Sequence, residues 1–222
     1  MRALNAKLTD QPSENPAELA GSLAEGAELL GIALDEHQRE RMLAYLALMR
    51  YWNRAYNLTA VTQPREMVAR HLLDSLSILP WVRGPEVLDA GTGGGLPGVV
   101  LAIACPAMRF RLVDGNGKKV RFLRQVRREL GLDNIEPVHA RLEALPVDPV
   151  PDTIVARALA PLGRMAGWTE RWLDRGARLL AMKSALDESE LGEVGGAYNV
   201  EVIHLEVPGL DARRSLAIVS KK

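Results

Sequence analysis

The stretch EVLDAGTGGGLPG, residues 86–98, decides the fold class of this chain. Its apolar beginning, residues 86–89, predicts a short buried strand, and the glycine-rich residues 91–98 predict a tight turn. A small apolar helix is expected from about residue 96 to residue 104. A strand that passes through glycines into a helix lets a ligand approach bare backbone at the N-terminus of that helix. The stretch therefore predicts a turn that binds a ligand.

The C-terminal side of this stretch continues to alternate between strand and helix patterns. We expect a helix at residues 118–130, and strands near residues 109–113, 135–139, 153–156, 178–182, 200–207 and 216–220. The last two strands are expected to close the sheet as a terminal hairpin. This alternation predicts a Rossmann-like α/β fold, with a mostly parallel sheet and helices on both faces.

The N-terminal side has helical periodicity instead. Asp35 and Gln38 resemble a capping box, so a helix is expected to begin there, and a weaker helical pattern precedes it at residues 18–32. Pro64 suits the first residue of a third helix, which Pro80 ends. We therefore divide the chain into a flexible polar tail at residues 1–16, a helical cap at residues 17–84 and a Rossmann-like domain at residues 85–222.

The composition excludes several classes of site. The 222 residues include 28 basic and 28 acidic side chains, so the net charge gives no indication of a nucleic-acid partner. The single cysteine, Cys105, excludes an internal disulfide and a cysteine-based zinc site, and no metal is expected. The N-terminus has no long apolar run, so we expect no signal peptide, no membrane contact and a cytoplasmic location.

Two kinds of cofactor fit the glycine turn. Gly93, Gly95 and Gly98 satisfy the G-x-G-x-x-G pattern of dinucleotide sites, although the pattern alone is weak. Asp89, at the end of the first strand, argues against NAD because an unpaired carboxylate would repel its pyrophosphate. The same carboxylate suits the α-amino group of S-adenosylmethionine (SAM), while the helix N-terminus holds the methionine carboxylate. SAM is therefore the favoured cofactor.

Two further acids follow the next two strands. Asp114 ends the second strand, 23 residues after Gly91, where a carboxylate can accept hydrogen bonds from ribose hydroxyls. Glu143 follows the third strand and is expected near the adenine. Turn residues that need no ligand would also be acidic at times, but three acids at three successive strand ends favour a cofactor site.

The chain lacks residues that some methylation reactions require, and this limits the possible methyl acceptors. Methylation of pyrimidine C5 needs a cysteine nucleophile, and Cys105 is expected to be a buried hydrophobic residue at the end of a small helix. Methylation of exocyclic amines often uses an Asn/Asp-Pro-Pro-aromatic turn after the fourth strand, where this chain has VARA at residues 155–158. An atom with a nucleophilic lone pair, such as guanine N7, needs neither the cysteine nor the turn. We therefore assign no catalytic base.

Basic side chains are concentrated in one expected helix. Six of them fall within eleven residues that contain no acid: Lys118, Lys119, Arg121, Arg124, Arg127 and Arg128. Such a patch on a neutral protein suggests contacts with phosphate groups, although a solvated helix face is equally consistent with it. In the cap, His71 and Asp74 lie three residues apart, which indicates a packed hydrogen bond more often than a catalytic dyad.

These residues resemble a known family, the bacterial methyltransferases of guanine N7 in 16S ribosomal RNA, also called glucose-inhibited division protein B. The resemblance runs from about residue 51 to the C-terminus. It is carried by NLTA at residues 57–60, RHLLDSL at 70–76, LDAGTGGGLPG at 88–98, KKVRFL at 118–123, RLE at 141–143, RA at 157–158 and RSL at 214–216. The LPG after the glycines and the HLLDSL stretch are more specific than any Rossmann fingerprint.

The resemblance implies an activity and a set of site residues. The expected reaction is SAM-dependent methylation of N7 of guanine 527 in 16S rRNA, either free or in a precursor of the small ribosomal subunit, by a monomer. The cofactor would contact Gly91, Leu96, Leu142, Glu143 and Arg157. Basic positions near the RNA or the reaction centre would be Lys119, Arg141 and Arg214.

The chain departs from the family pattern at two positions. Gly115 replaces a serine after the second-strand acid, which would loosen a hydrogen bond near the ribose, and Leu159 replaces an aromatic residue that could stack. Three alternatives remain open: a methyltransferase for another RNA or a small molecule, an NAD-dependent oxidoreductase, and a non-catalytic RNA-binding assembly protein.

Overall fold

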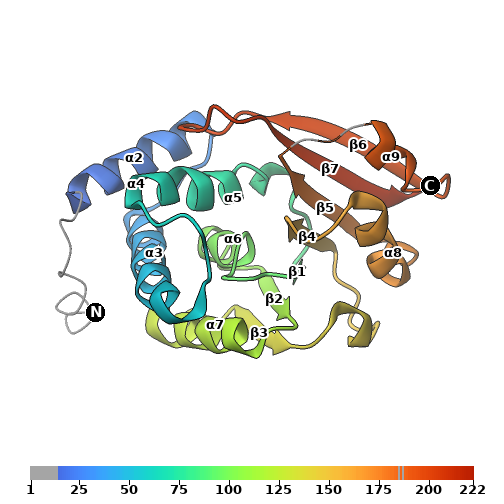
Figure 1. Cartoon of the computed structure of the whole chain (residues 1–222), viewed down its shortest axis with the longest axis horizontal. Coiled ribbons are helices and arrows are strands. Elements are labelled where there is room, and N and C mark those ends of the chain that lie inside the picture. The colour runs from blue at the N-terminus through green and yellow to red at the C-terminus, as the bar shows by residue number, and fades with distance from the viewer. Residues whose placement is uncertain (1–14, 185, 187) are drawn as a thin grey trace.

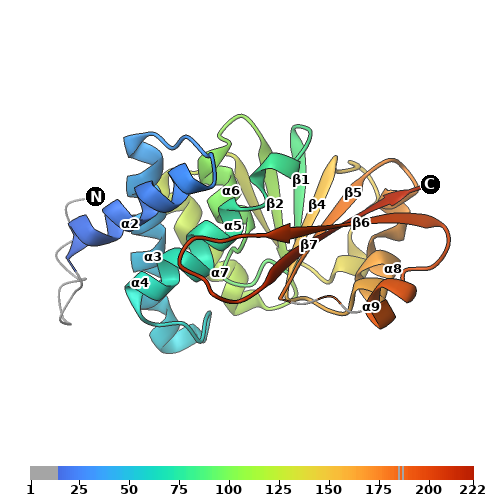
Figure 2. The same cartoon turned by 90° about the horizontal axis from the view of Figure 1, so that it is seen from above.

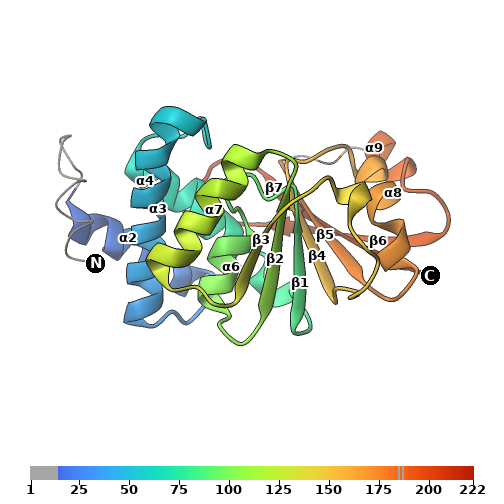
Figure 3. The ribbon, with the colours of Figure 1, turned by 90° about the horizontal axis from the view of Figure 1, so that it is seen from below.

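A seven-stranded sheet forms the centre of the molecule (Figures 1 and 3). The computed structural model describes residues 15–184, 186 and 188–222. The strands lie in the order β3-β2-β1-β4-β5-β7-β6, and the bounds are β1 Glu86–Ala90, β2 Arg109–Asp114, β3 Ile135–His139, β4 Thr153–Arg157, β5 Arg178–Lys183, β6 Tyr198–Leu205 and β7 Arg214–Lys221. The first five are parallel, whereas β7 runs antiparallel to both β5 and β6. The mostly parallel sheet and the terminal hairpin are thus confirmed.

The strand order places the glycine turn at a switch point. The chain leaves β1 toward β2 and β3 on one side, and then returns to place β4 and β5 on the other side. Open α/β sheets bind ligands in the crevice outside the carboxyl ends of the strands where the order reverses. The carboxyl ends of β1 and β4 are therefore the place to look for a site.

The two faces of the sheet bury separate apolar clusters, because successive side chains of a strand point to opposite faces. Val87 of β1 packs with the helices α6 (Gly98–Ala104) and α7 (Gly117–Leu130), whereas the next residue, Leu88, packs with α8 (Leu162–Leu173). Helices on both faces are therefore confirmed. The helix α8 was not predicted, and neither were the short α9 (Glu188–Gly192) and the 3-10 turn η3 (Leu142–Ala144).

The N-terminal helices share the first of these clusters. They are α2 (Pro16–Leu29), α3 (Glu36–Tyr56), α4 (Pro64–Met67), the π-helical segment η1 (Val68–Leu73), α5 (Asp74–Leu76) and the 3-10 turn η2 (Leu79–Trp81). Their buried side chains form one cluster with those of α6 and α7. The capping box of Asp35 and Gln38 is confirmed, and α3 ends at Asn57 in a left-handed conformation. The predicted tail lies outside the described residues, except for Asn15 and Pro16, which cap and begin α2.

The β6–β7 hairpin reaches back to the N-terminal helices (Figure 2). The loop between the two strands lines a hollow together with Leu29 of α2, and Gly209 in this loop lies against Ala69 of η1. The loop that leads into β7 therefore packs against η1, while β7 itself pairs with β5 and β6. Within the described part of the chain, no helix has the length and apolar character that crossing a bilayer requires.

Candidate active site

The glycine turn is built over a buried carboxylate. Asp89, the last residue but one of β1, has no exposed surface, and its Oδ2 accepts hydrogen bonds from Thr92 Oγ1 at 2.6 Å and from the backbone nitrogen of Gly98 at 2.8 Å. Gly98 is the first residue of α6, so its N–H has no partner inside the helix. The expectation of an unpaired carboxylate is therefore wrong for Oδ2. Oδ1 has no hydrogen-bond partner among the described residues.

The turn requires glycine at several positions. The φ angles of Gly91, Gly93 and Gly95 are +67°, +60° and +101°, a region that other residues rarely adopt. A Cβ atom on Gly95 would lie 2.5 Å from Val99 Cγ2 and 2.8 Å from Leu123 Cδ2. The backbone here is thus open to a ligand on one side and closely packed against α6 and α7 on the other.

Asp114 connects the turn to the next helix. Its Oδ2 accepts a hydrogen bond from the backbone nitrogen of Gly93 at 2.9 Å, and its Oδ1 accepts one from that of Asn116 at 2.7 Å. Lys119 Nζ lies 3.8 Å from the same carboxylate. Because β1 and β2 are parallel neighbours, the acids that end them meet at one edge of the sheet. The ribose contact expected for Asp114 stays a prediction.

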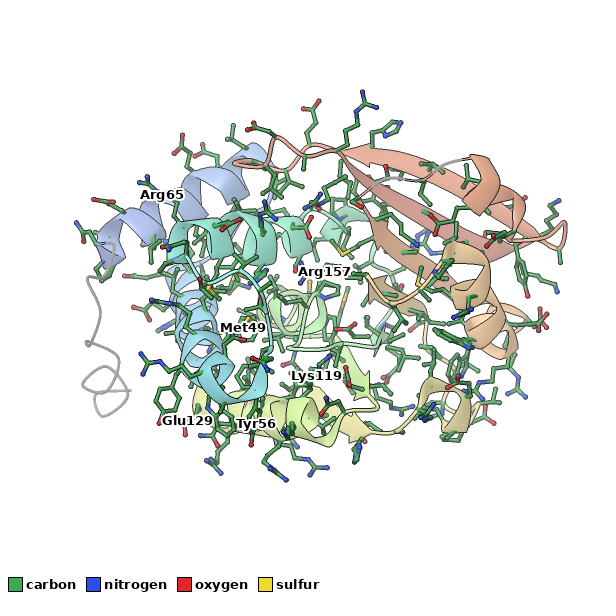
Figure 4. The ribbon with its side chains drawn as sticks, viewed as in Figure 1. Met49, Tyr56, Arg65, Lys119, Glu129 and Arg157 are labelled. Carbon is green, nitrogen blue, oxygen red and sulfur yellow. The ribbon has the colours of Figure 1, made fainter. Side chains whose placement is uncertain are left out.

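A pocket of about 710 Å³ opens at this edge of the sheet. Six of the predicted residues line it, namely Gly91, Gly93, Leu96, Lys119, Arg157 and Arg214. Figure 4 shows Arg157 and Lys119 reaching the middle of the molecule from opposite sides. The wall also includes residues that were not predicted to take part, among them Leu58, Thr59, Asp74 and Lys183. The pocket brings together a glycine turn and four cationic side chains.

Other predicted residues lie away from this pocket. Leu142 and Glu143 form the turn η3 after β3, where Leu142 is buried and Glu143 is exposed. Arg171 of α8 donates hydrogen bonds to both of their carbonyl oxygens. The exposed side chains of Lys118, Arg121, Arg124 and Arg141 do not line the pocket. The buried side chains of α7 are the predicted Val120, Phe122, Leu123, Val126 and Leu130, so its basic residues face outward.

The two departures from the family pattern have different surroundings. Gly115 has open space beside it, and the nearest side-chain atom to a Cβ added there would be Cγ of Arg141, at 3.9 Å. Leu159 is half-buried against the turn, because a Cβ on Gly91 would lie only 2.3 Å from its Cδ1. An apolar side chain is therefore retained beside the glycine turn even though the aromatic ring is absent.

His71 and Asp74 do not form a pair. Nε2 of His71 lies 2.9 Å from Thr59 Oγ1, while Asp74 accepts hydrogen bonds from Arg157 and Arg214. The interpretation of a mutual hydrogen bond is wrong because both carboxylate oxygens of Asp74 accept hydrogen bonds from arginines, and Nε2 of His71 pairs with Thr59. Burial, followed by the charge of Arg157, lowers the pKa of His71 to about 4, so its imidazole is neutral at pH 7.

An N-terminal helix also contacts the glycine turn. Tyr45 of α3 is fully buried, and its hydroxyl donates a hydrogen bond to the carbonyl oxygen of Gly94 at 2.7 Å. A Cβ on Gly94 would lie 3.2 Å from Cε of Met49 and 3.6 Å from Cβ of Leu58. No local sequence pattern indicates this contact, since Tyr45 reads only as an apolar position of α3. The N-terminal helices therefore form part of the site.

Comparison with known proteins identifies the family. The family model described as rRNA small subunit methyltransferase G matches residues 38–217. The chain belongs to this family. A ribosomal RNA small subunit methyltransferase G from Pseudomonas aeruginosa is 50% identical over 204 residues, which cover 91% of this chain and 95% of the relative. One from Klebsiella pneumoniae is 44% identical over 193 residues, 86% of this chain and 93% of the relative.

Solved structures agree on the fold. A magnesium protoporphyrin IX methyltransferase from Synechocystis, with bound SAM, covers 85% of this chain and 99% of its own at 18% identity and a TM-score of 0.55. A tRNA methyltransferase from B. subtilis covers 67% of this chain and 65% of its own at 13% identity, also with a TM-score of 0.55. This chain therefore shares its fold with both methyltransferases.

Membership of the rRNA small subunit methyltransferase G family makes this chain a SAM-dependent methyltransferase. The alternatives of an NAD-dependent oxidoreductase and a non-catalytic protein are thereby contradicted. The residues present fit the cofactor on one direct observation: the buried Oδ1 of Asp89, beneath the glycine turn, has no hydrogen-bond partner in the part of the chain that the structure describes. An acceptor of this kind suits the positively charged amino group of the methionine part of SAM.

Acidification should weaken the binding of SAM. Burial raises the pKa of Asp89 to about 6, so the side chain is charged at pH 7.5 and mostly neutral at pH 5. We expect the affinity for SAM to fall about tenfold between these pH values in the wild type, and much less in Asp89→Asn. Isothermal titration calorimetry at the two pH values measures this difference. Equal pH dependence in both proteins would contradict the assignment.

The stability of the fold should change in the opposite direction. The folded-state pKa of Asp89 lies above the ordinary value of 3.8, so its protonated form favours the native state. This contribution is complete below pH 3.8 and is lost as the pH rises through about 6. Relative to Asp89→Asn, the wild type should therefore lose thermal stability between about pH 4 and pH 6, and matched denaturation scans give that difference.

Proposed function

We propose that the chain transfers a methyl group from SAM to N7 of a guanine in 16S rRNA, guanine 527 by its family resemblance. The observation that carries the proposal is the pocket at the glycine turn, whose wall has four cationic side chains, Lys119, Arg157, Lys183 and Arg214, and two acids, Asp74 and Glu190. A pocket with this charge suits a nucleotide within a phosphate backbone better than a neutral small molecule. We expect a monomer that acts in the cytoplasm on rRNA or on a precursor of the small subunit.

Residues of the pocket and residues near it would share the binding and orientation of the cofactor and the substrate. The glycine turn and the N-terminus of α6 would receive the methionine part, with Asp89 beneath it. Asp114 would hold the ribose, and Leu142 with Glu143 would border the adenine. Arg157 would lie between the cofactor and the substrate, and Lys119 and Arg214 would contact the RNA. The places of Lys119, Arg157 and Arg214 in the pocket wall, and the hydrogen bond of Asp114 to Gly93 in the turn, support these assignments. Those of Leu142 and Glu143, in the turn η3, rest on the family resemblance.

The chemistry requires little proton transfer. SAM supplies a methyl group on a sulfonium centre, and guanine N7 offers a lone pair and no proton. The N7–methyl bond forms as the sulfur–methyl bond breaks, which leaves a cationic base and S-adenosylhomocysteine. Orientation of the two reactants is the main demand on the protein. The neutral, hydrogen-bonded imidazole of His71 does not line the pocket, consistent with the absence of a general base.

A single-turnover assay with radiolabelled SAM tests the proposal. Free 16S rRNA, small ribosomal subunits and 23S rRNA are offered separately, and cleavage at N7-methylguanine maps the product. We expect methylation of one guanine of 16S rRNA, either free or within the subunit. Labelling of 23S rRNA alone, or of an exocyclic nitrogen, would contradict the substrate or the acceptor atom, whereas no labelling of any RNA would point to a small-molecule substrate.

The outer face of α7 should contribute to the binding of RNA. The exposed Arg121 and Arg124 lie next to the turn of α7 that carries Lys119. We expect the double variant Arg121→Ala/Arg124→Ala to bind RNA more weakly, with a salt slope lower by about one unit for each phosphate group that is no longer neutralised. Affinity for SAM should be nearly unchanged.

A matched control uses two arginines at the other end of the sheet. Arg109 begins β2 and Arg175 follows α8, and both guanidinium groups are largely exposed. Replacing both with alanine removes the same charge far from the pocket, so the salt slope should stay at the wild-type value. Equal salt slopes in the α7 variant and the wild type would show that the basic face of α7 is exposed to solvent and does not contact RNA.

A further inference from the structure

A single carboxylate joins three distant segments beside the pocket. Asp74 follows η1, Arg157 ends β4, and Arg214 begins β7. Arg157 Nη1 donates a hydrogen bond to Asp74 Oδ2 at 3.1 Å, and Arg214 Nε donates one to Oδ1 at 3.0 Å. Each oxygen therefore holds one guanidinium group. In Figures 1 and 4, α5 lies beside the carboxyl ends of the strands, with Arg157 next to it.

Burial differs between the carboxylate and its two partners. The side chain of Asp74 is 4% exposed, whereas those of Arg157 and Arg214 are 23% and 17% exposed. All three line the pocket. The carboxylate thus lies behind the guanidinium groups, and these present the remaining positive charge to the pocket.

The arrangement depends on the charge of Asp74. Two guanidinium groups so close together repel each other, and a shared carboxylate offsets that repulsion. Charge-assisted hydrogen bonds also fix the planes of both groups, which limits the rotamers that each long side chain can adopt. Removing the charge would leave two partly buried cations without compensation, which is costly.

The π-helical turn places Asp74 at this position. The N–H of Asp74 donates to the carbonyl oxygen of Ala69, five residues earlier, where an α-helix would use the carbonyl of Arg70. Arg157 Nη1 donates to that Arg70 carbonyl at 2.9 Å. Single π turns within helices are frequent at functional sites because they redirect side chains. Here the turn brings a carboxylate and a backbone carbonyl to the same guanidinium group.

We propose that Asp74 is a positioning residue, whose two carboxylate oxygens orient Arg157 and Arg214 toward the substrate in the pocket. The inference rests on the proposed function, because it assigns the two arginines to the site of methyl transfer. It also implies that the pocket depends on the N-terminal helices, because the carboxylate that holds the arginines of β4 and β7 directly follows η1. Asp74 does not itself contact the reacting atoms.

The central variant is Asp74→Asn, which keeps the size of the side chain and removes its charge. We expect a loss of 10-fold to 100-fold in kcat/KM for methylation of small ribosomal subunits. In a protein that already carries Arg157→Ala and Arg214→Ala, the same change should cause little further loss, because its targets are gone. A similar loss in both backgrounds, or no loss in the wild-type background, would overturn the proposal.

Two further variants separate positioning from folding. Glu66→Gln removes a carboxylate from the same helical region, where Glu66 pairs with Arg70 at 2.8 Å on the exposed side, and it should leave kcat/KM unchanged. Asp74→Glu keeps the charge and moves it by one methylene. Its melting temperature should stay close to that of the wild type while kcat/KM falls. Wild-type kcat/KM in Asp74→Glu would refute a geometric role.

An NMR measurement separates this inference from the proposed function. The Nε–H of Arg214 should give a slowly exchanging ¹⁵N-correlated signal in the wild type and in Glu66→Gln, but not in Asp74→Asn. Absence of that signal from the wild type would overturn the positioning contact. Its presence in a wild type that methylates no RNA would refute the proposed function instead, and with it the role of the contact in methyl transfer.

Discussion

Gly95→Ala is expected to reduce the affinity for SAM by 100-fold or more. At φ +101° an alanine is strained, and its Cβ would lie 2.5 Å from Val99 Cγ2, 2.8 Å from Leu123 Cδ2 and 3.1 Å from the Tyr45 hydroxyl. Backbone strain of roughly 1–3 kcal/mol and overpacking of similar size add to about 2–6 kcal/mol. We expect the backbone of the turn to rearrange and relieve this strain, so that the conformation that binds SAM is lost. Calorimetric titration with SAM measures the loss.

The neighbouring glycine supplies the matched control. Gly94 lies in the same turn without a positive φ, and a Cβ there would contact Cε of Met49 at 3.2 Å. The end of a methionine side chain can move by a few tenths of an ångström, so Gly94→Ala should change SAM affinity by no more than about threefold. If both alanine variants weaken SAM binding to the same extent, the left-handed conformation at residue 95 is not the cause.

Asp89→Ala should weaken SAM binding by about 1.5–3 kcal/mol, which is roughly 10-fold to 150-fold. The change removes the charged acceptor and leaves two donors without a partner in a fully buried place, Thr92 Oγ1 and the N–H of Gly98. Both donors belong to the turn, so its conformation is lost together with the charge. Titration with SAM and with S-adenosylhomocysteine gives the two affinities.

A carboxylate at the other end of β1 serves as the control for this variant. Asp152 Oδ2 also accepts a backbone hydrogen bond, from the nitrogen of Glu86 at 3.0 Å, but at the amino end of the strand. Asp152→Ala should leave the affinity for SAM unchanged. An unchanged affinity in Asp89→Ala, in protein that remains folded, would remove Asp89 from the binding site.

The elements that the sequence revealed share a strong local pattern. The strands near the glycine turn are short apolar runs between turn residues, and all seven were found within a few residues of their bounds. The helix α8 was missed because its start has no side-chain cap and Gly163 and Gly167 interrupt its pattern. Burial of Trp172 and Met165 stabilises this helix, and such packing depends on the tertiary fold. The π turn at η1 was also missed, because its residues have the same periodicity as an ordinary α-helix.

Without the family resemblance, which supplied Arg157 and Arg214, the site was predictable only where it is local. The glycine turn and the acids after β1 and β2 are encoded by residues that adjoin the strands, so their clustering follows from a parallel sheet. The hydrogen bonds of Asp74 join residues separated by 83 and 140 positions, and that of Tyr45 with Gly94 spans 49. Periodicity cannot reveal partners at such separations, because nothing in either segment specifies the other.

The hydrogen bond from Tyr45 to Gly94 makes the cofactor part of the protein's folding equilibrium. A ligand that selects one conformation of the turn also favours the position of α3 that supplies the hydroxyl. Because the buried side chains of α3 belong to the same cluster as those of α6 and α7, partial opening of α3 would disturb the turn as well. Occupancy by SAM is therefore expected to stabilise α3 together with the turn by mass action, so that protein without SAM should open more readily at α3.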